Sequence, residues 1–513
     1  GGGAVAPTTY DIVIPSALAN IVKADKTKAA AGDTVTLTAA GEGTLTVTDA
    51  NGNPVPGVVV SDGFTCTQTD AEGQYVLTRN AESGFVFYSL PSGYKVNMHK
   101  TYKLPKFFTK LKPETARYDF TLTALDAPET RFDLICIGDP QINEAAHAVR
   151  FKREAAKDIR EYSASADIPC YAIHLGDLVN NKWALYSNMV VALQPEQTGI
   201  PVFSTIGNHD HEFPTANEKE ARAKYESFFG PVDYSFNRGD VHIVSMDNII
   251  HECQESAGYT GGFSAEQYEW LKQDLSYVPK DKMVILCVHI PFRNSKYAYY
   301  DEVLELLSQY KYATIMSAHT HSNINHIHTK NGKEIFEHVT GTSCGAWWRS
   351  TVCTEGTPIG FGIYRIEGAA MKEWNYKSVQ HGEDFQIRLY RGSDKFTGGG
   401  DASYYFSKKN AGQIVANIWN WDPAWTVNVY ENGAMTGTMT QYSDKDAWTV
   451  AYHIGILNNS SSYNKATDHM FYYTLTNPDA DVKVEAIDRF GNKYEQTVFT
   501  DPDSHPGIYH LDY

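Results

Sequence analysis

The sequence predicts an α/β protein with a β-rich segment at each end. Residues 127–382 alternate apolar runs with longer amphipathic stretches, a pattern typical of strands that alternate with helices. Residues 1–126 and 383–513 instead show short alternating runs separated by turn residues, which is typical of β-sandwiches. We therefore expect three domains with these boundaries, which a chain of 513 residues is long enough to form.

Apolar runs in the central segment predict its strands. They lie at 132–139, 170–177, 201–210, 241–247, 282–290 and 313–321. Between them, residues 144–164 and 265–278 carry helical patterns. Ligands of such layered domains bind where the strands end, and the unusual polar residues of this sequence lie at those ends.

The N-terminal segment predicts short strands with period-2 alternation. They lie at 33–40, 43–63 and 65–79 and are punctuated by Asn-Gly, Pro-Gly and Glu-Gly. The stretch "GNPVPGVVVSDG…TQTDAEGQYVL" resembles the carboxypeptidase-regulatory-like, transthyretin-type β-sandwich. Such modules are usually structural, and the segment contains no catalytic cluster.

The C-terminal segment predicts a second β-sandwich, with strand-like runs within 417–433 and 481–499. Its tryptophans are expected in the core or between sheets, with a sugar-binding platform as the alternative. They are Trp419, Trp421, Trp425 and Trp448.

Composition narrows the class of ligand. The chain carries 44 Lys and Arg against 61 Asp and Glu, a formal net charge of −17, so the average surface repels DNA and RNA, and we expect no nucleic-acid partner. A small phosphorylated substrate is compatible with this charge, because bound metal ions invert the local field. No run of eighteen apolar residues occurs, so we expect no transmembrane helix.

Cysteine usage and the start of the chain bear on the compartment. The seven cysteines lack CxxC spacing; Cys136 and Cys287 are expected in the core, and a disulfide between Cys344 and Cys353 is left open. The chain begins at Gly1 without a methionine. We interpret this as the removal of an export signal and expect an extracytoplasmic location: periplasmic, surface-anchored or secreted.

Polar residues follow the predicted strands at regular places. A single Gly-Asp there is weak evidence, because both residues are common in turns, and His289 alone is compatible with a core histidine. The complete series, with each member after an apolar run, indicates one site. In chain order it comprises Asp139, Gln141, Asp177, Asn208, His209, Asp210, His289, His319 and His321.

These residue types match the needs of phosphate ester hydrolysis. The reaction requires charge neutralisation and an activated water, which two divalent ions about 3.5–4 Å apart supply. Mixed carboxylate and imidazole ligands suit Mn, Fe or Zn, whereas oxygen-only cages suit Mg. One carboxylate must bridge the ions, and the His-x-His spacing of "HTH" puts both rings on one side of an extended chain.

The series "GDPQ", "GDLVNN", "GNHDH", "VHIP" and "AHTH" resembles the calcineurin-like metallophosphoesterase superfamily over about 130–330. The resemblance implies a four-layer αββα sandwich, flanked here by β-sandwich domains, with a dinuclear metal centre and a metal-bound hydroxide as the nucleophile. By position, Asp139 and His321 bind the first metal and Asp177 bridges. The second metal is bound by Asn208, His289 and His319.

The resemblance also assigns two residues that bind no metal. His209 contacts the phosphate and protonates the leaving group, and Asp210 orients His209. The sequence departs from the family pattern at Ala318, where glycine is usual, and at Gln141, where histidine is usual. Gln141 is either a weak neutral ligand or a hydrogen-bond partner of a metal-bound water. Because glutamine binds metal less strongly than histidine, the first metal site is expected to bind its ion less tightly and could accept Mg.

Other residues near the strand ends are candidates for substrate binding. Asn180 and His211 follow ligand motifs, and Arg293 with Asn294 follows His289. Arg293 is either a phosphate clamp or a solvated surface residue. Trp347 and Trp348 either stack on a leaving group or pack in the interior.

The sequence thus predicts a secreted phosphatase-like hydrolase of phosphate mono- or diesters. The expected substrate is a small-molecule or glycan-linked phosphate ester. The alternative is a phosphate- or glycan-binding scaffold with a degenerate site, which only Gln141 favours.

Overall fold

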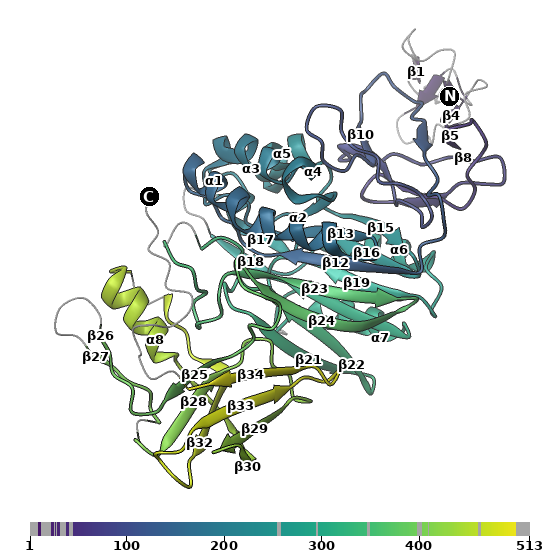
Figure 1. Cartoon of the computed structure of the whole chain (residues 1–513). Helices are drawn as coiled ribbons and strands as arrows, with labels where there is room; N and C mark the ends of the chain where they lie inside the picture. The colour runs from purple at the N-terminus through teal and green to yellow at the C-terminus, as the bar shows by residue number, and fades with distance from the viewer. Residues whose placement is uncertain are drawn as a thin grey trace, which may run out of the picture.

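Figure 1 shows the chain as a computed structural model. The structure describes residues 9–11, 22–24, 26, 28–30, 37–39, 45–253, 258–293, 296–345, 349–397, 403–408, 410–459 and 463–498. The N-terminal module (within 1–126) and the C-terminal module (within 383–513) lie on opposite sides of the central domain (within 127–382). Among the helices of these described stretches, none has the length and apolarity to cross a membrane.

Two mixed sheets form the middle of the central domain. Their strands are β12 (Arg131–Ile137), β13 (Cys170–Leu175), β14 (Val202–Thr205), β15 (Tyr234–Arg238), β16 (Val241–Ser245), β19 (Met283–Cys287), β20 (Tyr312–Ser317), β21 (Ile324–Lys330), β22 (Lys333–Val339), β23 (Gly360–Glu367) and β24 (Ala370–Ser378). One sheet has the order β14-β13-β12-β23-β24 and the other β15-β16-β19-β20-β22-β21. In the first sheet β12, β13 and β14 run parallel, and in the second β16, β19, β20 and β22 do. The carboxyl ends of these strands therefore gather at one edge of each sheet.

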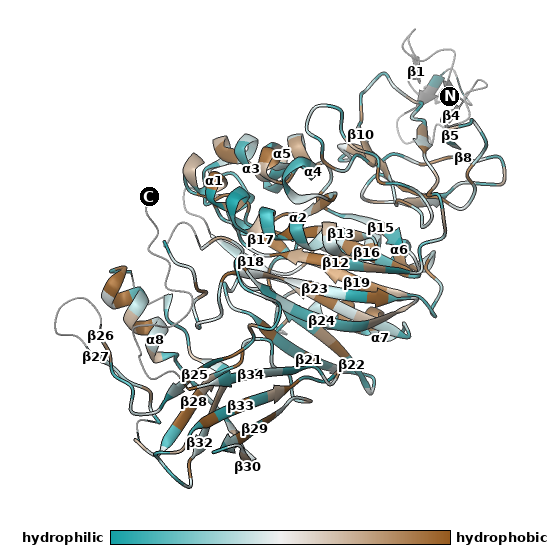
Figure 2. Cartoon of the chain, in the orientation of Figure 1, coloured by the Kyte–Doolittle hydropathy of each residue, from teal (hydrophilic) through white to brown (hydrophobic). Residues whose placement is uncertain are grey.

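Alternate side chains of β12 separate the layers. Leu134 and Cys136 point into the core between the two sheets, which also contains Leu286 of the second sheet. Ile135 and Ile137 point to the opposite face, where they share a core with Phe151 of the covering helices. Hydrophobic residues accordingly run along the central strands, and the helices mix both kinds (Figure 2). The predicted αββα layering is confirmed.

The helices cover the outer faces of the two sheets (Figure 1). They are α1 (Ala145–Arg153), α2 (Ala155–Ser165), α3 (Tyr186–Ala192), α4 (Pro195–Thr198), α5 (Glu218–Phe229), α6 (Ala265–Ser276) and α7 (Tyr300–Ser308). The helical pattern at 144–164 proves to be two helices that meet at Glu154, whose φ of −106° and ψ of −94° leave the helical region. The Glu154 carboxylate accepts a hydrogen bond from Arg150 Nε at 3.0 Å, and Arg150 Nη2 donates to the Ser350 carbonyl, so tertiary contacts fix this junction.

The N-terminal module contains a four-stranded sheet, β10-β9-β6-β7, and a three-stranded sheet, β11-β5-β8. Their strands are β5 (Leu45–Asp49), β6 (Val59–Ser61), β7 (Cys66–Gln68), β8 (Gln74–Tyr75), β9 (Phe85–Tyr88), β10 (Phe108–Lys110) and β11 (Phe120–Leu122). Four short strands precede them: β1 (Thr9–Asp11), β2 (Val22–Ala24), β3 (Lys28–Ala30) and β4 (Leu37–Ala39). Of the predicted run 33–40, only β4 lies among the described residues.

The described part of the C-terminal module contains two four-stranded sheets, β25-β28-β32-β31 and β30-β29-β33-β34. Its strands are β25 (Arg388–Arg391), β26 (Phe396–Thr397), β27 (Ser403–Tyr404), β28 (Gln413–Asn417), β29 (Thr426–Glu431), β30 (Ala434–Thr438), β31 (Thr440–Asp444), β32 (Thr467–Thr474), β33 (Val482–Ile487) and β34 (Lys493–Thr497). Between β31 and β32 lie α8 (Ala447–Val450) and a π-helical turn (Ala451–Ile456).

The tryptophans of this module belong to its interior, as the sequence predicts. Trp419, Trp425 and Trp448 are buried, and Trp421 packs against the core from a partly buried position. Arg388, itself buried, lies 4.2 Å from the ring centre of Trp448. These rings therefore hold the module together.

Candidate active site

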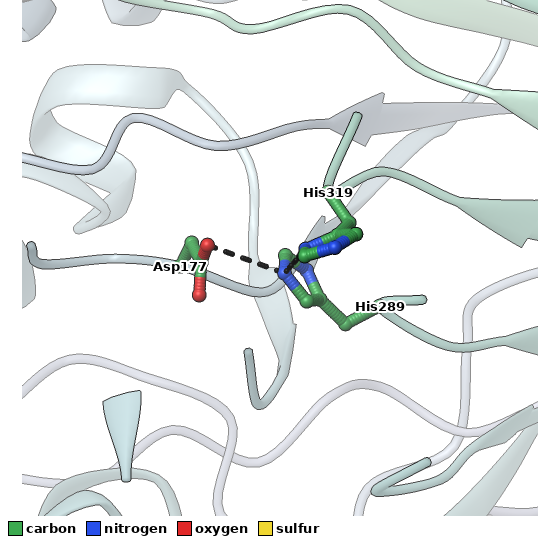
Figure 3. A group of neighbouring side chains, drawn as sticks. All are labelled: Asp177, His289 and His319. Atoms are coloured by element: carbon green, nitrogen blue, oxygen red, sulfur yellow. Dashed lines mark hydrogen bonds and ion pairs between the residues drawn. The ribbon is translucent and has the colours of Figure 1, made fainter. Parts of the chain in front are cut away.

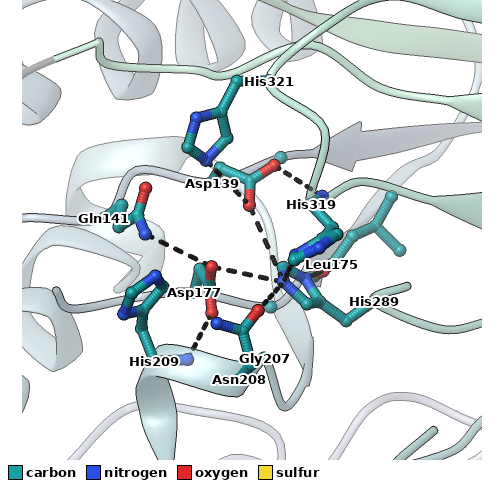
Figure 4. A network of polar contacts seen from close by, with 12 residues as sticks. Asp139, Gln141, Leu175, Asp177, Gly207, Asn208, His209, His289, His319 and His321 are labelled. Carbon is teal, nitrogen blue, oxygen red and sulfur yellow. Dashed lines mark hydrogen bonds and ion pairs between the residues drawn. The ribbon is translucent and has the colours of Figure 1, made fainter. Parts of the chain in front are cut away.

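The strand ends bring the predicted residues to one place. Asp139 and Asp177 follow β12 and β13, and residues 208–210 form a single 3-10 turn after β14. His289 follows β19, and His319 follows β20. Figure 4 shows the side chains of Asp139, Asp177, Asn208, His289 and His319 gathered in one place.

The backbone at these positions is unusual. Five site residues adopt left-handed φ values: Asp139 (37°), Gln141 (41°), Asp177 (56°), His319 (63°) and His321 (52°). Such conformations are costly for residues with a side chain and cluster at functional sites. Here they turn the chain sharply after each strand, which aims successive side chains into the same space.

Two glycines allow the close packing of these turns. A Cβ on Gly207 would collide with the backbone nitrogen and the carboxylate of Asp177, and one on Gly176 would collide with the ring of His289. Gly176 also has a φ of 98°. The Gly-Asp and Gly-Asn-His motifs therefore have a steric basis.

Asp177, His289 and His319 form the first group of facing acceptors (Figure 3). His289 Nε2 lies 3.2 Å from Asp177 Oδ2 and 3.2 Å from His319 Nδ1. The same nitrogen lies 3.0 Å from Asn208 Oδ1. His289 Nδ1 lies 2.8 Å from the Leu175 carbonyl oxygen, to which it donates, so Nε2 is the ring nitrogen that faces the other residues of the site.

Asp139, Asp177 and His321 form the second group. Asp139 Oδ2 accepts a hydrogen bond from the His319 backbone N–H at 3.0 Å. Asp139 Oδ1 is buried without a hydrogen-bond donor among the described residues and lies 3.7 Å from His321 Nε2. Asp177 belongs to both groups, which is the arrangement a bridging carboxylate requires.

Burial and mutual charge shift the pKa values of the group. Burial, together with the charge of Asp177, raises the pKa of Asp139 well above its usual range. Burial opposes ionisation of Asp177 too, but His289 holds the pKa of that carboxyl below its usual value. Burial lowers the pKa of His289, whereas Asp177 raises it more strongly, to about 9.

The other two histidines of the acceptor groups, His319 and His321, have lowered pKa values and are therefore neutral. Burial, with the charge of His289, lowers the pKa of His319 to about 3, and burial lowers the pKa of His321 well below its usual range. Neutral imidazole is the form that binds metal ions.

The residues present fit a pair of metal ions. Carboxylate oxygens, imidazole nitrogens and an amide oxygen converge from different strands, and a cation between such facing donor atoms would offset their mutual repulsion. The donor-free Asp139 Oδ1 is one such atom. Oxygen and nitrogen donors of this mixture suit Mn, Fe or Zn.

Gln141 lies beside the bridging carboxylate rather than apart from it. Its backbone N–H donates to the Asp177 carbonyl oxygen at 2.8 Å, and its Nε2 lies 3.4 Å from Asp177 Oδ2. The side chain thus reaches the site, with its amide nitrogen facing Asp177 (Figure 4).

His209 is held differently from the sequence-based expectation. Its backbone N–H donates to Asp177 Oδ1 at 2.8 Å, and its Nδ1 lies 2.8 Å from Asn181 Oδ1. Asn181, and not Asp210, is therefore the side chain that orients the ring. Asn181 follows Asp177 by four residues in "GDLVNN", but no sequence signal separates it from the neighbouring Asn180, which the sequence predicts as the substrate residue.

Asp210 supports the backbone of the site. Its carboxylate accepts hydrogen bonds from the backbone N–H groups of Gly207 at 2.9 Å and Leu178 at 3.0 Å, which joins two of the strand-end turns. Tyr186 donates to the Asp210 carbonyl at 2.7 Å. Burial and the charge of Asp177 raise the pKa of Asp210 to about 7. Its expected role of orienting the His209 ring is corrected to this backbone role.

The predicted substrate-binding residues lie in different environments, and only some of them are among the described residues. His211 is buried, with Nδ1 3.0 Å from the Gly207 carbonyl and Nε2 3.1 Å from Asp247, so it supports the turn rather than facing a ligand. Asn180 is half-buried, and its backbone N–H donates to the Ile142 carbonyl. Arg293 is exposed and lines a cleft of about 460 Å³ between β21 and the C-terminal module. Asn294, Trp347 and Trp348 lie outside the described residues.

Asn248 is a further supporting residue that the sequence did not reveal. Its Oδ1 accepts from the backbone N–H groups of His289 and Ile290 at 3.2 and 3.0 Å. Asn248 stands in "SMDNII" after β16, three residues beyond Ser245, and no motif distinguishes it there.

The cysteines Cys344 and Cys353, whose pairing the sequence leaves open, are thiols in the structure.

Fold and site define a class: an αββα protein with a buried carboxylate–imidazole site at the carboxyl ends of its strands. Residues 132–323 match the family model of the calcineurin-like phosphoesterases. Residues 42–125 match the model of the N-terminal part of calcineurin-like phosphoesterase, and residues 337–494 match that of its C-terminal part. The chain belongs to the calcineurin-like metallophosphoesterases, with both flanking modules.

Plant phosphatases are among its relatives. Purple acid phosphatase 18 of Arabidopsis thaliana is 28% identical over 188 residues, which is 32% of this chain and 40% of that protein. Purple acid phosphatase 15 of the same plant is 30% identical over 141 residues, or 24% of this chain and 25% of that protein. The chain therefore spans less than half the length of these curated relatives.

Solved structures show the same kind of partial similarity. The purple acid phosphatase PPD1 from yellow lupin (Lupinus luteus) aligns over 49% of this chain and 52% of its own, at 15% identity and a TM-score of 0.35. The 5'-nucleotidase from Candida albicans aligns over 48% and 50%, at 13% identity and a TM-score of 0.31.

Proposed function

We propose that this protein hydrolyses phosphate esters with two divalent metal ions, Mn, Fe or Zn. The observation that carries the proposal is the convergence of the two acceptor groups on the shared carboxylate of Asp177. When bound, the ions supply charge neutralisation and lower the pKa of water. The similarity to the purple acid phosphatases supports the same reaction class.

In this proposal the residues divide the work. Asp139 and His321 hold one ion, Asn208, His289 and His319 the other, and Asp177 both. Gln141 stabilises the Asp177 carboxylate by its amide, which its 3.4 Å contact supports better than direct ligation. We also propose that the N-terminal module is a transthyretin-type β-sandwich, which its four-stranded and three-stranded sheets support.

His209 is the proposed general acid. With Asn181 Oδ1 accepting from Nδ1–H, Nε2 is the nitrogen that passes a proton to the departing oxygen. The anchoring of the His209 N–H on Asp177 keeps this ring beside the metal-binding carboxylate. Proton donation of this kind contributes a factor of about 10²–10⁴ to the rate.

The test uses 4-nitrophenyl phosphate and bis(4-nitrophenyl) phosphate with added Mn²⁺, together with metal analysis. We expect turnover that Asp177→Asn abolishes. We expect His209→Ala to lower kcat by about 10²–10⁴ while the metal content stays at the wild-type level. Less than one metal per chain with no turnover above the Asp177→Asn variant would refute the enzyme and favour a phosphate-binding scaffold.

A further inference from the structure

Lys465 brings a positive charge from the C-terminal module to the histidine turn. It lies in the segment before β32, and its Nζ donates a hydrogen bond to the Thr320 carbonyl at 2.9 Å. Thr320 stands between His319 and His321. The ammonium group is therefore fixed at the turn that carries one histidine of each acceptor group.

The backbone around Lys465 is fixed as well. Its N–H donates to the Thr354 carbonyl at 2.9 Å, and the Thr354 N–H donates in turn to the His321 carbonyl at 3.0 Å. The Thr354 hydroxyl reaches the same His321 oxygen at 3.1 Å. The main chain of Lys465 thus connects through Thr354 to the turn that its side chain contacts directly, and both contacts fix the position of the charge.

The position leaves the ammonium able to bind a ligand. Lys465 is exposed, and an ammonium has three donor hydrogens, of which the Thr320 carbonyl takes one. Its acceptor, the Thr320 carbonyl, lies directly between the two histidines in the chain, so the charge stands beside the candidate metal site. A phosphoryl oxygen is the ligand that a fixed ammonium beside a metal site is suited to bind.

We propose that Lys465 binds the phosphate group of the substrate and makes the site prefer phosphate monoesters to diesters. A monoester carries up to two negative charges and a diester one, and the attraction to a fixed charge scales with the ligand's charge. The inference rests on the proposed function, which it deepens by naming the substrate class. It also makes the C-terminal module part of the active site.

The experiment compares Lys465→Met with Lys465→Arg and with Lys445→Met, which removes an exposed lysine elsewhere in the module. The probes are 4-nitrophenyl phosphate, bis(4-nitrophenyl) phosphate and inorganic phosphate, the last bound to metal-loaded protein and followed by calorimetry. We expect Lys465→Met to lower phosphate affinity and monoester kcat/KM about tenfold, with the diester kcat/KM within about threefold and metal content unchanged. Lys465→Arg should restore most of the phosphate affinity.

The outcomes separate this inference from the proposed function. Unchanged phosphate affinity in Lys465→Met, or a parallel loss for both esters, overturns the role of Lys465. A fall in metal content in that variant also overturns it, because it shows that Lys465 only supports the histidine turn. If the wild type cleaves neither ester, the proposed function fails, while the calorimetric comparison with Lys445→Met still decides whether Lys465 binds phosphate.

Discussion

The two flanking modules contact the central domain in different ways. The N-terminal module packs on α6, where Trp270 Nε1 donates to Ser61 Oγ at 3.0 Å and the Trp270 ring lies 6.5 Å from that of Phe87. The C-terminal module contacts the loops that follow β20 and β22. There, Asn323 donates to the Trp419 carbonyl at 2.8 Å, and His453 lies 2.6 Å from Ser350.

This difference separates a structural contact from a functional one. The contact on α6 buries apolar rings on the outer side of the second sheet and involves none of the predicted site residues. The contact at the other side reaches the segment 319–323 and so bears on the position of His319 and His321. Changes at the first junction should alter stability alone, and changes at the second should alter the site as well.

The largest expected effect is on stability at the N-terminal junction. Trp270 is fully buried, so Trp270→Ala should cost about 3–5 kcal/mol in the free energy of unfolding. Chemical denaturation measures this loss. Metal content and kcat/KM of the folded fraction should remain at wild-type values, and a fall in either would show that this junction also shapes the site.

A second prediction concerns acid pH and the C-terminal junction. Burial lowers the pKa of His453 from 6.5 to about 4, so the folded protein keeps this ring neutral while the unfolded chain takes up a proton. The stabilisation is complete above pH 6.5 and is lost as the pH falls toward 4, by about 2 kcal/mol at pH 5. This loss of stability is measured by hydrogen exchange of residues 447–457 at pH 7 and at pH 5. His453→Gln should remove this part of the pH dependence, and an unaltered dependence would contradict the assignment.

The smallest effects come from a matched pair of single hydrogen bonds. Ser61→Ala and Asn323→Ala each remove one bond between a module and the central domain, and each should cost about 1 kcal/mol. Only Asn323→Ala should also weaken metal binding and lower kcat/KM, because Asn323 follows His321 by two residues. Equal behaviour of the two variants in metal titration would erase the distinction between the junctions.

Much of this architecture could be predicted from the sequence. The apolar runs gave the positions of β12, β13, β14, β16, β19 and β20 to within a few residues at most ends, because buried parallel strands are nearly continuous in hydrophobicity. The strand-end motifs brought Asp139, Asp177 and the histidines to one site for the same reason: parallel strands end at one edge.

What escaped prediction depends on contacts between distant segments. Asn181 and Asn248 act through hydrogen bonds to His209 and His289, and nothing in their local sequence separates them from turn residues. The family resemblance predicts that Asp210 contacts His209, whereas its carboxylate accepts hydrogen bonds from the backbone amides of Gly207 and Leu178. Lys465 lies 145 residues from its acceptor Thr320, so only the folded arrangement relates them.

The hydrogen bond from the His319 N–H to Asp139 joins residues 180 positions apart. Contacts of such separation form late in folding, since the intervening chain must close first. The ligand set therefore exists only after both sheets have formed. We expect ion uptake to follow folding, so that a chelator should yield an inactive but folded protein that regains its ions without refolding.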